Sequence, residues 1–282
     1  MAFVEVSLPR RRWIADLGEA AFIEAGGVVP SQPLVLMEEY GITLSMGDYG
    51  DAFDGLLEHR AGRFHIYCNV KEIDHPTSTR IRFTISHELG HYFIDEHRLA
   101  LASGRAPFHS SFIDTDATLI IETEANLFAS HFLLPQQAFR NAVVRAKPGL
   151  QSLVDIASTF DVSAQATVIR YVEECPVPCA GVMFRPGKRA WPAISPTLRK
   201  LNYDTLSVTD AAKLPDGFAA KLAFLAPAPI GLSDVFEAPS TAEFWFKNIS
   251  ASSKRNCVIL EQAVRLGPYG VLALLQFPNQ AS

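Results

Sequence analysis

Apolar side chains recur at helical spacing in several stretches of the N-terminal half. The strongest pattern covers residues 119–135 and ends at Pro135, because proline disfavours helical geometry in the residue before it. Residues 83–94, 12–25 and 34–40 also repeat apolar positions as amphipathic helices do. β-forming residues cluster or alternate over 42–46 and 63–70, which predicts strands. Helices and strands mixed in this way indicate an α+β domain.

Residues 95–118 show little periodicity and contain Ser103-Gly104 and Pro107, so they predict a long loop between two helices. His97 and His109 lie on this stretch. Either could stabilise an oxyanion, but a single histidine on a loop is more often exposed to solvent, and that is our expectation for both.

The second half begins with two short helical patterns. Residues 151–171 predict a helix, a tight turn at Asp161-Val162 and a second helix, which is the shape of a helix-turn-helix. Cys175-Pro-Val-Pro-Cys179 then breaks the helical pattern and marks a boundary, and the two cysteines are expected to be structural or free thiols. Beyond it we predict strands over 181–184, 244–249, 256–262 and 269–277 and a helix near 216–224.

Three parts follow from these patterns. They are a first domain over residues 1–145, a helix-turn-helix-like segment over 146–175, and a smaller, strand-rich mixed α/β C-terminal domain over 176–282, which is a candidate sensor. The aromatic run 244–246 is expected to lie in the core of this last domain.

Composition argues against a membrane-spanning or a secreted protein. The chain has 282 residues, 48% of them hydrophobic and 20% charged, with a net charge of −5. No run approaches the roughly 20 apolar residues of a membrane span, and Met1 to Pro9 lacks the features of a signal peptide. Four scattered cysteines suit a reducing compartment, so we expect a cytoplasmic protein. Direct DNA binding is not expected, because Arg170 is the one basic residue of the second helix of the pair.

Candidate chemistry lies at His87-Glu88-Leu-Gly-His91. Histidines four residues apart share a helix face and can bind one tetrahedral metal, while Glu88 stands beside the metal as a general base for water. Gly90 weakens a helix by about 1 kcal/mol relative to alanine, so its place between the two histidines suggests that something packs closely there.

A catalytic metal needs a third protein ligand. Glu122 and Glu124 both lie on the downstream helix, about 200° apart around its axis. Glu122 shares a stripe with small residues that would let this helix approach the motif helix, so we predict it as the ligand and Glu124 as surface charge. Asn126, one turn after Glu122, can hydrogen-bond the free ring nitrogen of a ligand histidine and fix its tautomer.

The stretch Arg-Ile-Arg-Phe-Thr-Ile-Ser-His-Glu-Leu-Gly-His at 80–91, followed by Glu122, Asn126 and Phe-Leu-Leu-Pro at 132–135, resembles the ImmA/IrrE family of metallopeptidases. The resemblance covers about residues 30–175. It implies a small gluzincin-like α+β peptidase domain with Zn²⁺, in which His87, His91 and Glu122 bind the metal. It also implies a protein substrate, namely a helix-turn-helix transcriptional repressor whose cleavage frees stress-response or mobile-element genes.

Two further expectations concern the substrate. An edge strand near residues 64–67 could pair with an extended polypeptide. The alternative to a peptidase is a regulatory binding or sensing module that uses the peptidase fold with little or no cleavage.

Overall fold

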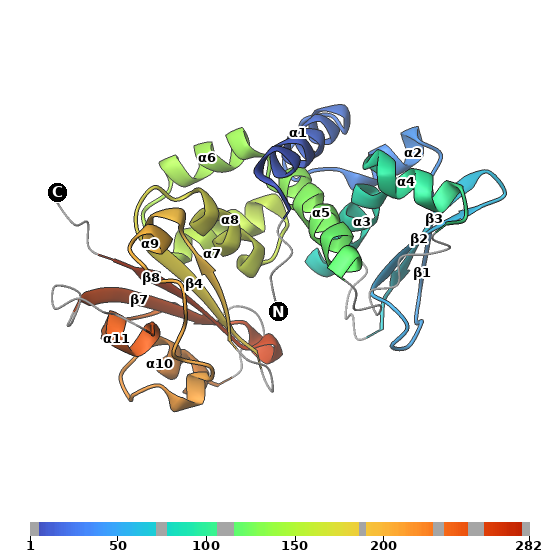
Figure 1. Ribbon diagram of the computed structural model, residues 1–282. Coiled ribbons are helices and arrows are strands. Elements are labelled where there is room, and N and C mark those ends of the chain that lie inside the picture. Colours follow the sequence, from blue (N-terminus) through green and yellow to red (C-terminus); the bar gives the residue numbers. More distant parts are fainter. Residues whose placement is uncertain are drawn as a thin grey trace. The chain divides into compact units, whose positions relative to one another are not determined.

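The computed structural model describes residues 6–71, 78–105, 116–185, 190–227, 234–247 and 257–277 (Figure 1). His109 and residues 248, 249 and 256 of the predicted strands lie outside these ranges. The chain forms two compact units. The first consists of residues 1–144 and 157–163, and the second of residues 145–156 and 164–282.

Helices and a small sheet make up the first unit. Its elements are α1 (Leu8–Glu24), α2 (Pro33–Glu39), β1 (Thr43–Gly47), β2 (Gly55–Arg60), β3 (Arg63–Asn69), α3 (Thr79–Phe93), α4 (Asp95–Ala102), α5 (Asp116–Leu133) and α6 (Gln136–Arg145). Helix α7 (Leu150–Phe160) contributes residues to both units. The α+β prediction is therefore confirmed, and the predicted helices and strands of this half are present with shifted ends.

Three predictions for the first unit need correction. Residues 95–102 are helical rather than a loop, and acidic Asp95 and Glu96 occupy the first turn of α4, where the helix dipole favours them. Strand β2 was missed. The predicted edge strand is instead the centre of the sheet, because the strand order is β1-β3-β2, with β1 parallel and β2 antiparallel to β3. Residues 64–67 therefore have no free edge for a substrate.

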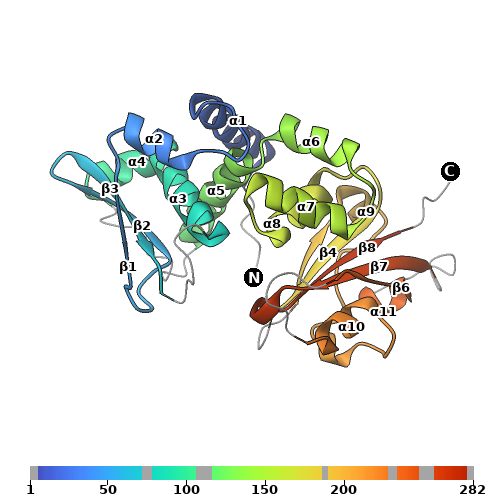
Figure 2. The same cartoon turned by 180° about the vertical axis from the view of Figure 1, so that it is seen from behind.

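Glycines allow the three long helices of this unit to approach closely. A Cβ on Gly90 of α3 would lie 3.1 Å from Cα of Ala125 in α5, which confirms the predicted close packing. A Cβ on Gly18 of α1 would lie 2.8 Å from the carbonyl oxygen of Phe128, on another side of the same helix. Helix α5 thus lies between α1 and α3 (Figures 1 and 2), with Phe128 and Phe132 fully buried.

A five-stranded antiparallel sheet forms the second unit (Figure 2). Its strands are β4 (Cys179–Phe184), β5 (Trp191–Ile194), β6 (Phe236–Thr241), β7 (Val258–Arg265) and β8 (Val271–Gln276), in the order β5-β4-β8-β7-β6. The helices are α8 (Ala164–Glu174), α9 (Pro196–Lys200), α10 (Ala219–Leu225) and α11 (Ala242–Trp245), with short 3-10 turns at Ala211–Lys213 and Gly267–Tyr269.

The sheet is covered on both faces within this unit. Helix α8 packs on β4, where a Cβ on Gly181 would lie 2.6 Å from Cγ1 of Val168. Alternate residues of the strands join α10 and α11 in the main apolar core, which includes Trp245 and Phe246. Residues 244–249 were predicted as a strand, but Phe244 and Trp245 end the short helix α11. Trp245 and Phe246 are core residues as expected, whereas Phe244 is half-exposed.

Both predicted helices of the helix-turn-helix-like segment are present, as α7 and α8. Asp161 takes the left-handed conformation (φ 52°) in the tight turn between them. Cys175 and Cys179 are free thiols and both are buried. Among the described residues, no helix is both long enough and apolar enough to cross a membrane.

Candidate metal centre

One group of His, Cys, Asp or Glu side chains in the described part of the chain could hold a metal ion. It consists of His87, His91 and Glu122, whose potential ligand atoms all lie within 4.8 Å of one another. Nε2 of His87 and Nε2 of His91 are 3.1 Å apart, and the Glu122 carboxylate lies 3.0 Å from the first and 3.5 Å from the second. Ligands about 2.0 to 2.1 Å from a tetrahedral ion stand roughly 3.3 Å apart, so one ion fits among these three groups.

Two helices supply these side chains. Ser78 caps α3 by accepting a hydrogen bond from the Ile81 amide. His87 and His91 are four residues apart on this helix and therefore share one face. Helix α5 brings Glu122 to the same place, and the contact of Gly90 with Ala125 sets the short distance between the helices. The two histidines of α3 and Glu122 of α5 therefore come together in the fold, as the helical spacing suggested.

The outer ring nitrogens of both histidines have partners. Nδ1 of His87 lies 3.0 Å from Oδ1 of Asn126, one helical turn after Glu122, so Asn126 is placed as the sequence suggested. Nδ1 of His91 lies 3.2 Å from Nδ1 of His97 on α4. His97 is only 4% exposed, so the expectation of a solvent-exposed side chain was wrong.

Glu88 is buried beside the histidines. Its Oε2 has no hydrogen-bond partner, and a Cβ on Gly55 of β2 would lie 2.5 Å from its Oε1. Burial raises the pKa of Glu88 to about 7. Because Gly55 has no side chain, there is space for the Glu88 carboxylate at this position. Its Oε2 has no hydrogen-bond partner and lies near the candidate metal ligands.

The converging groups affect one another's charge. Burial opposes ionisation of Glu122, but hydrogen bonds from His87 and His91 outweigh it and hold the pKa of this carboxyl well below its usual range. Burial likewise opposes a charged His87, yet its contact with Glu122 raises the pKa of the imidazole. The site therefore attracts positive charge, as a cation site requires.

Comparison with known proteins shows a family similarity for the part of the chain that carries this site. Residues 73–171 match the family model of the IrrE N-terminal-like domain, Peptidase_M78. A curated relative, the radiation response metalloprotease IrrE of Deinococcus radiodurans, is 29% identical over 111 residues, which are 39% of this chain and 32% of the relative. The segment is therefore similar to the ImmA/IrrE metallopeptidase family. The match spans about a third of the length of that relative.

A solved structure shares the fold well beyond the ImmA/IrrE segment. A Mycobacterium tuberculosis transcriptional regulator superimposes with a TM-score of 0.57 at 16% sequence identity, over 95% of this chain and 90% of that one. At this identity the likeness describes the fold alone.

A further expectation inside this segment, about Glu124, was also wrong. Glu124, predicted as surface charge, is 5% exposed and accepts hydrogen bonds from Arg10 of α1 at 2.9 and 2.8 Å. Its position about 200° from Glu122 is as expected, but α1 and α4 cover that side of α5. A contact 114 residues away in sequence leaves no periodic signal, so the sequence did not reveal it.

Proposed function

We propose that the protein is a zinc-dependent endopeptidase that hydrolyses a peptide bond in a protein substrate. His87, His91 and Glu122 bind the metal, Glu88 is the general base, and Asn126 orients His87. The observation that carries this proposal is the convergence of two imidazoles and a carboxylate beside a buried, partly unpaired Glu88. The family of residues 73–171 supports it.

The donor set fits zinc. Two histidines and one glutamate are a ligand set of catalytic zinc sites, which keep the fourth position open, whereas magnesium and calcium prefer oxygen ligands. Bound zinc would supply a Lewis acid that polarises a carbonyl and lowers the pKa of water. These ligand preferences favour zinc over magnesium and calcium.

Glu88 would move the proton in this reaction. Its unpaired Oε2 can accept a proton from the attacking water and later release it to the leaving amine. A pKa of about 7 suits both steps at neutral pH, since the group can then exist in either protonation state.

For the substrate class we propose a helix-turn-helix transcriptional repressor, whose cleavage would derepress stress-response or mobile-element genes. The family resemblance and the radiation response named for the Deinococcus relative support this class. The protein's own helical pair is a poor DNA reader, because Arg170 of α8 is 4% exposed and forms an ion pair with Glu174 at 2.9 Å. A buried arginine cannot reach phosphates, so we propose that the chain acts on the repressor and not on its operator.

The test compares the native protein with Glu88→Gln. Purified repressors encoded next to this gene are incubated with each protein in the presence of zinc, and cleavage is followed by gel and mass spectrometry. We expect Glu88→Gln to keep its zinc and to lose at least about 100-fold in cleavage rate, because it cannot accept a proton.

Three results would count against the proposal. Native protein that binds zinc but forms complexes with repressors without cleaving them would favour the regulatory binding module. Cleavage by Glu88→Gln at the native rate would remove Glu88 from its role. Native protein that binds no zinc would contradict the metal site itself.

A further inference from the structure

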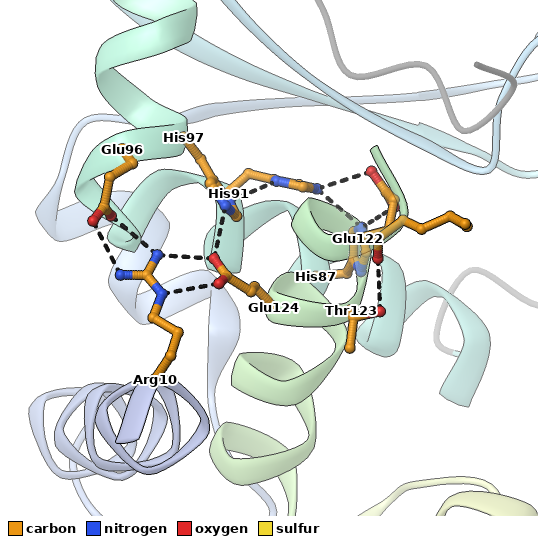
Figure 3. Close-up of polar contacts among 9 residues, drawn as sticks. Arg10, His87, His91, Glu96, His97, Glu122, Thr123 and Glu124 are labelled. Carbon is orange, nitrogen blue, oxygen red and sulfur yellow. Dashed lines mark hydrogen bonds and ion pairs between the residues drawn. The ribbon is translucent and has the colours of Figure 1, made fainter. Parts of the chain in front are cut away.

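A chain of polar contacts runs from His91 through the interior of the first unit to helix α1 (Figure 3). Nδ1 of His91 meets Nδ1 of His97 at 3.2 Å, and Nε2 of His97 meets Oε2 of Glu124 at 3.1 Å. Glu124 in turn holds Arg10 through both carboxylate oxygens. The three side chains His91, His97 and Glu124 are 1%, 4% and 5% exposed, so water does not screen these contacts.

Hydrogen-bond chemistry gives this chain a direction. If Nε2 of His91 binds a metal as a neutral imidazole, its Nδ1 carries the proton and must donate. Nδ1 of His97 is then the acceptor, so the proton of a neutral His97 sits on Nε2 and is donated to Glu124. The opposite order would place a proton on Nε2 of His91, where it would block the metal.

Arg10 contacts the Glu124 carboxylate through two hydrogen bonds. A buried carboxylate is costly without a partner, and Arg10 supplies two charge-assisted hydrogen bonds in a fork. Arg10 is itself held in place, because its other contacts go to the Glu96 carboxylate at 3.0 and 3.1 Å and to the Trp13 ring, whose centroid is 4.7 Å from the guanidinium carbon. Arg10, the last residue in this series of contacts, is therefore held by Glu124 on one side and by Glu96 and Trp13 on the other.

We propose that His97, Glu124 and Arg10 are positioning residues for His91. They hold its ring and its tautomer so that the Nε2 lone pair is presented to the metal. The inference rests on the proposed metal role of His91. It differs from the support of His87, where one amide, Asn126, does the same for a more exposed ring.

The effect should appear in metal affinity, before any turnover. Replacing a residue that orients a metal ligand costs about 10- to 100-fold in metal affinity. We therefore expect His97→Leu, which removes the acceptor for His91, to weaken zinc binding by that factor. His97→Gln offers a side-chain carbonyl as acceptor and should restore part of the affinity.

A matched control exists on the same helices. His131 of α5 and Glu19 of α1 form a second imidazole–carboxylate contact at 3.2 Å, with side chains 11% and 28% exposed, away from the metal ligands. His131→Leu should lower the stability of the fold as His97→Leu does and leave zinc affinity unchanged. Thermal unfolding of the metal-free proteins measures the first effect, and competition with a chromophoric chelator measures the second.

Cobalt(II) provides a readout that a merely structural role would not move. The visible absorption of bound cobalt(II) reports ligand number and geometry, and we expect a changed spectrum in His97→Leu, a spectrum closer to native in His97→Gln, and a native spectrum in His131→Leu. Arg10→Met acts on a side chain that is 27% exposed, so it tests the far end of the chain without opening the core. It should weaken zinc binding less than His97→Leu does.

The outcomes separate this inference from the proposed function. If His97→Leu and Arg10→Met bind zinc as tightly as native protein and give the native cobalt spectrum, the positioning role is wrong, while the peptidase proposal stands. If Glu122→Ala also binds zinc normally, the metal site itself is wrong. Should His97→Leu fail to fold, Arg10→Met decides: native zinc affinity together with the native cobalt spectrum in this variant would overturn the inference.

Discussion

Buried polar side chains are arranged differently in the two units. In the first unit, the buried polar residues gather around the candidate metal ligands. They include Glu88, His91, His97 and Glu124, each at most 5% exposed. In the second unit, the buried acid Glu261 on β7 accepts a hydrogen bond of 2.6 Å from the Ala220 amide near the start of α10. Its carboxyl also has hydrogen bonds with the side chains of Ser240 and Trp245, and Ile259 and Ala263 on the same strand belong to the main apolar core.

This difference indicates what the buried polar groups do in each unit. Burying a charge is expensive unless partners compensate, and in the first unit the compensation converges on the lone pairs of the candidate metal ligands. In the second unit the buried carboxyl of Glu261 instead joins helix α10 to strand β7 through its hydrogen bond with the Ala220 amide. Changes near the first cluster should therefore alter metal chemistry, whereas changes in the second unit should alter stability alone.

The largest effect within this comparison is expected for Gly55→Ala. The added Cβ would lie 2.5 Å from both Oε1 of Glu88 and Cγ2 of Thr84, so the carboxylate must move. A displacement of about 1 Å in a catalytic group can cost roughly 100-fold in rate, so we expect a loss of that order in repressor cleavage with zinc content unchanged.

Gly47→Ala is the control for this prediction. Gly47 lies on β1 of the same sheet, and the nearest neighbour of an added Cβ would be the Tyr49 side chain, at 3.1 Å. Cleavage should remain near native in this variant. Equal rates for the two variants would show that the space beside Glu88 is not needed.

A smaller effect, on stability alone, is expected for Gly181→Ala in the second unit. The added Cβ would lie 2.6 Å from Cγ1 of Val168, and overpacking of this kind costs about 1 to 3 kcal/mol. Urea unfolding should show the loss, and zinc affinity should stay native. The double variant with Val168→Ala should recover part of the stability. A weakened zinc affinity in Gly181→Ala would contradict the prediction that this change affects stability alone.

The smallest effect is a pH dependence at Glu261. Burial raises the pKa of this carboxyl in the folded protein, so the unfolded chain releases the proton at lower pH. Stability contributed by the protonated group is present below the unfolded pKa of about 4.3 and is lost as pH rises toward the folded pKa. Glu261→Gln cannot titrate.

We therefore expect the stability of Glu261→Gln relative to native protein to increase between pH 4 and pH 8, measured as the urea midpoint at each pH. Parallel curves for the two proteins would show that the carboxyl has the same pKa in the folded and unfolded chains. The corresponding zinc affinities should not differ at any pH.

Helical periodicity was sufficient to predict the candidate ligands. His87, His91, Glu122 and Asn126 are related by short spacings within two helices, so local geometry places each of them. It also placed Glu124 on the opposite side of α5 correctly. What periodicity cannot show is whether that side faces water or another helix, and α1 arrives there from more than 100 residues away.

The missed elements have physical reasons of their own. Strand β2 begins Gly-Leu-Leu-Glu, which lacks the β-branched residues that mark strands, and its pairing with β3 supplies the stabilisation. The aromatic run at 244–246 suggested a strand, but Trp245 is buried and donates from Nε1 to Ser240, which suits a short helix folded back on β6. In both cases tertiary contacts override local preference.

The reach of Arg10 has a practical consequence for work with fragments of this protein. The family match begins at residue 73, so a fragment cut to those limits would lack α1. It would leave the carboxylate of Glu124 without its guanidinium and expose the side of Phe128 and Phe132 against which Gly18 packs. A truncated protein intended for assays should therefore begin before Ser7, the residue that caps α1.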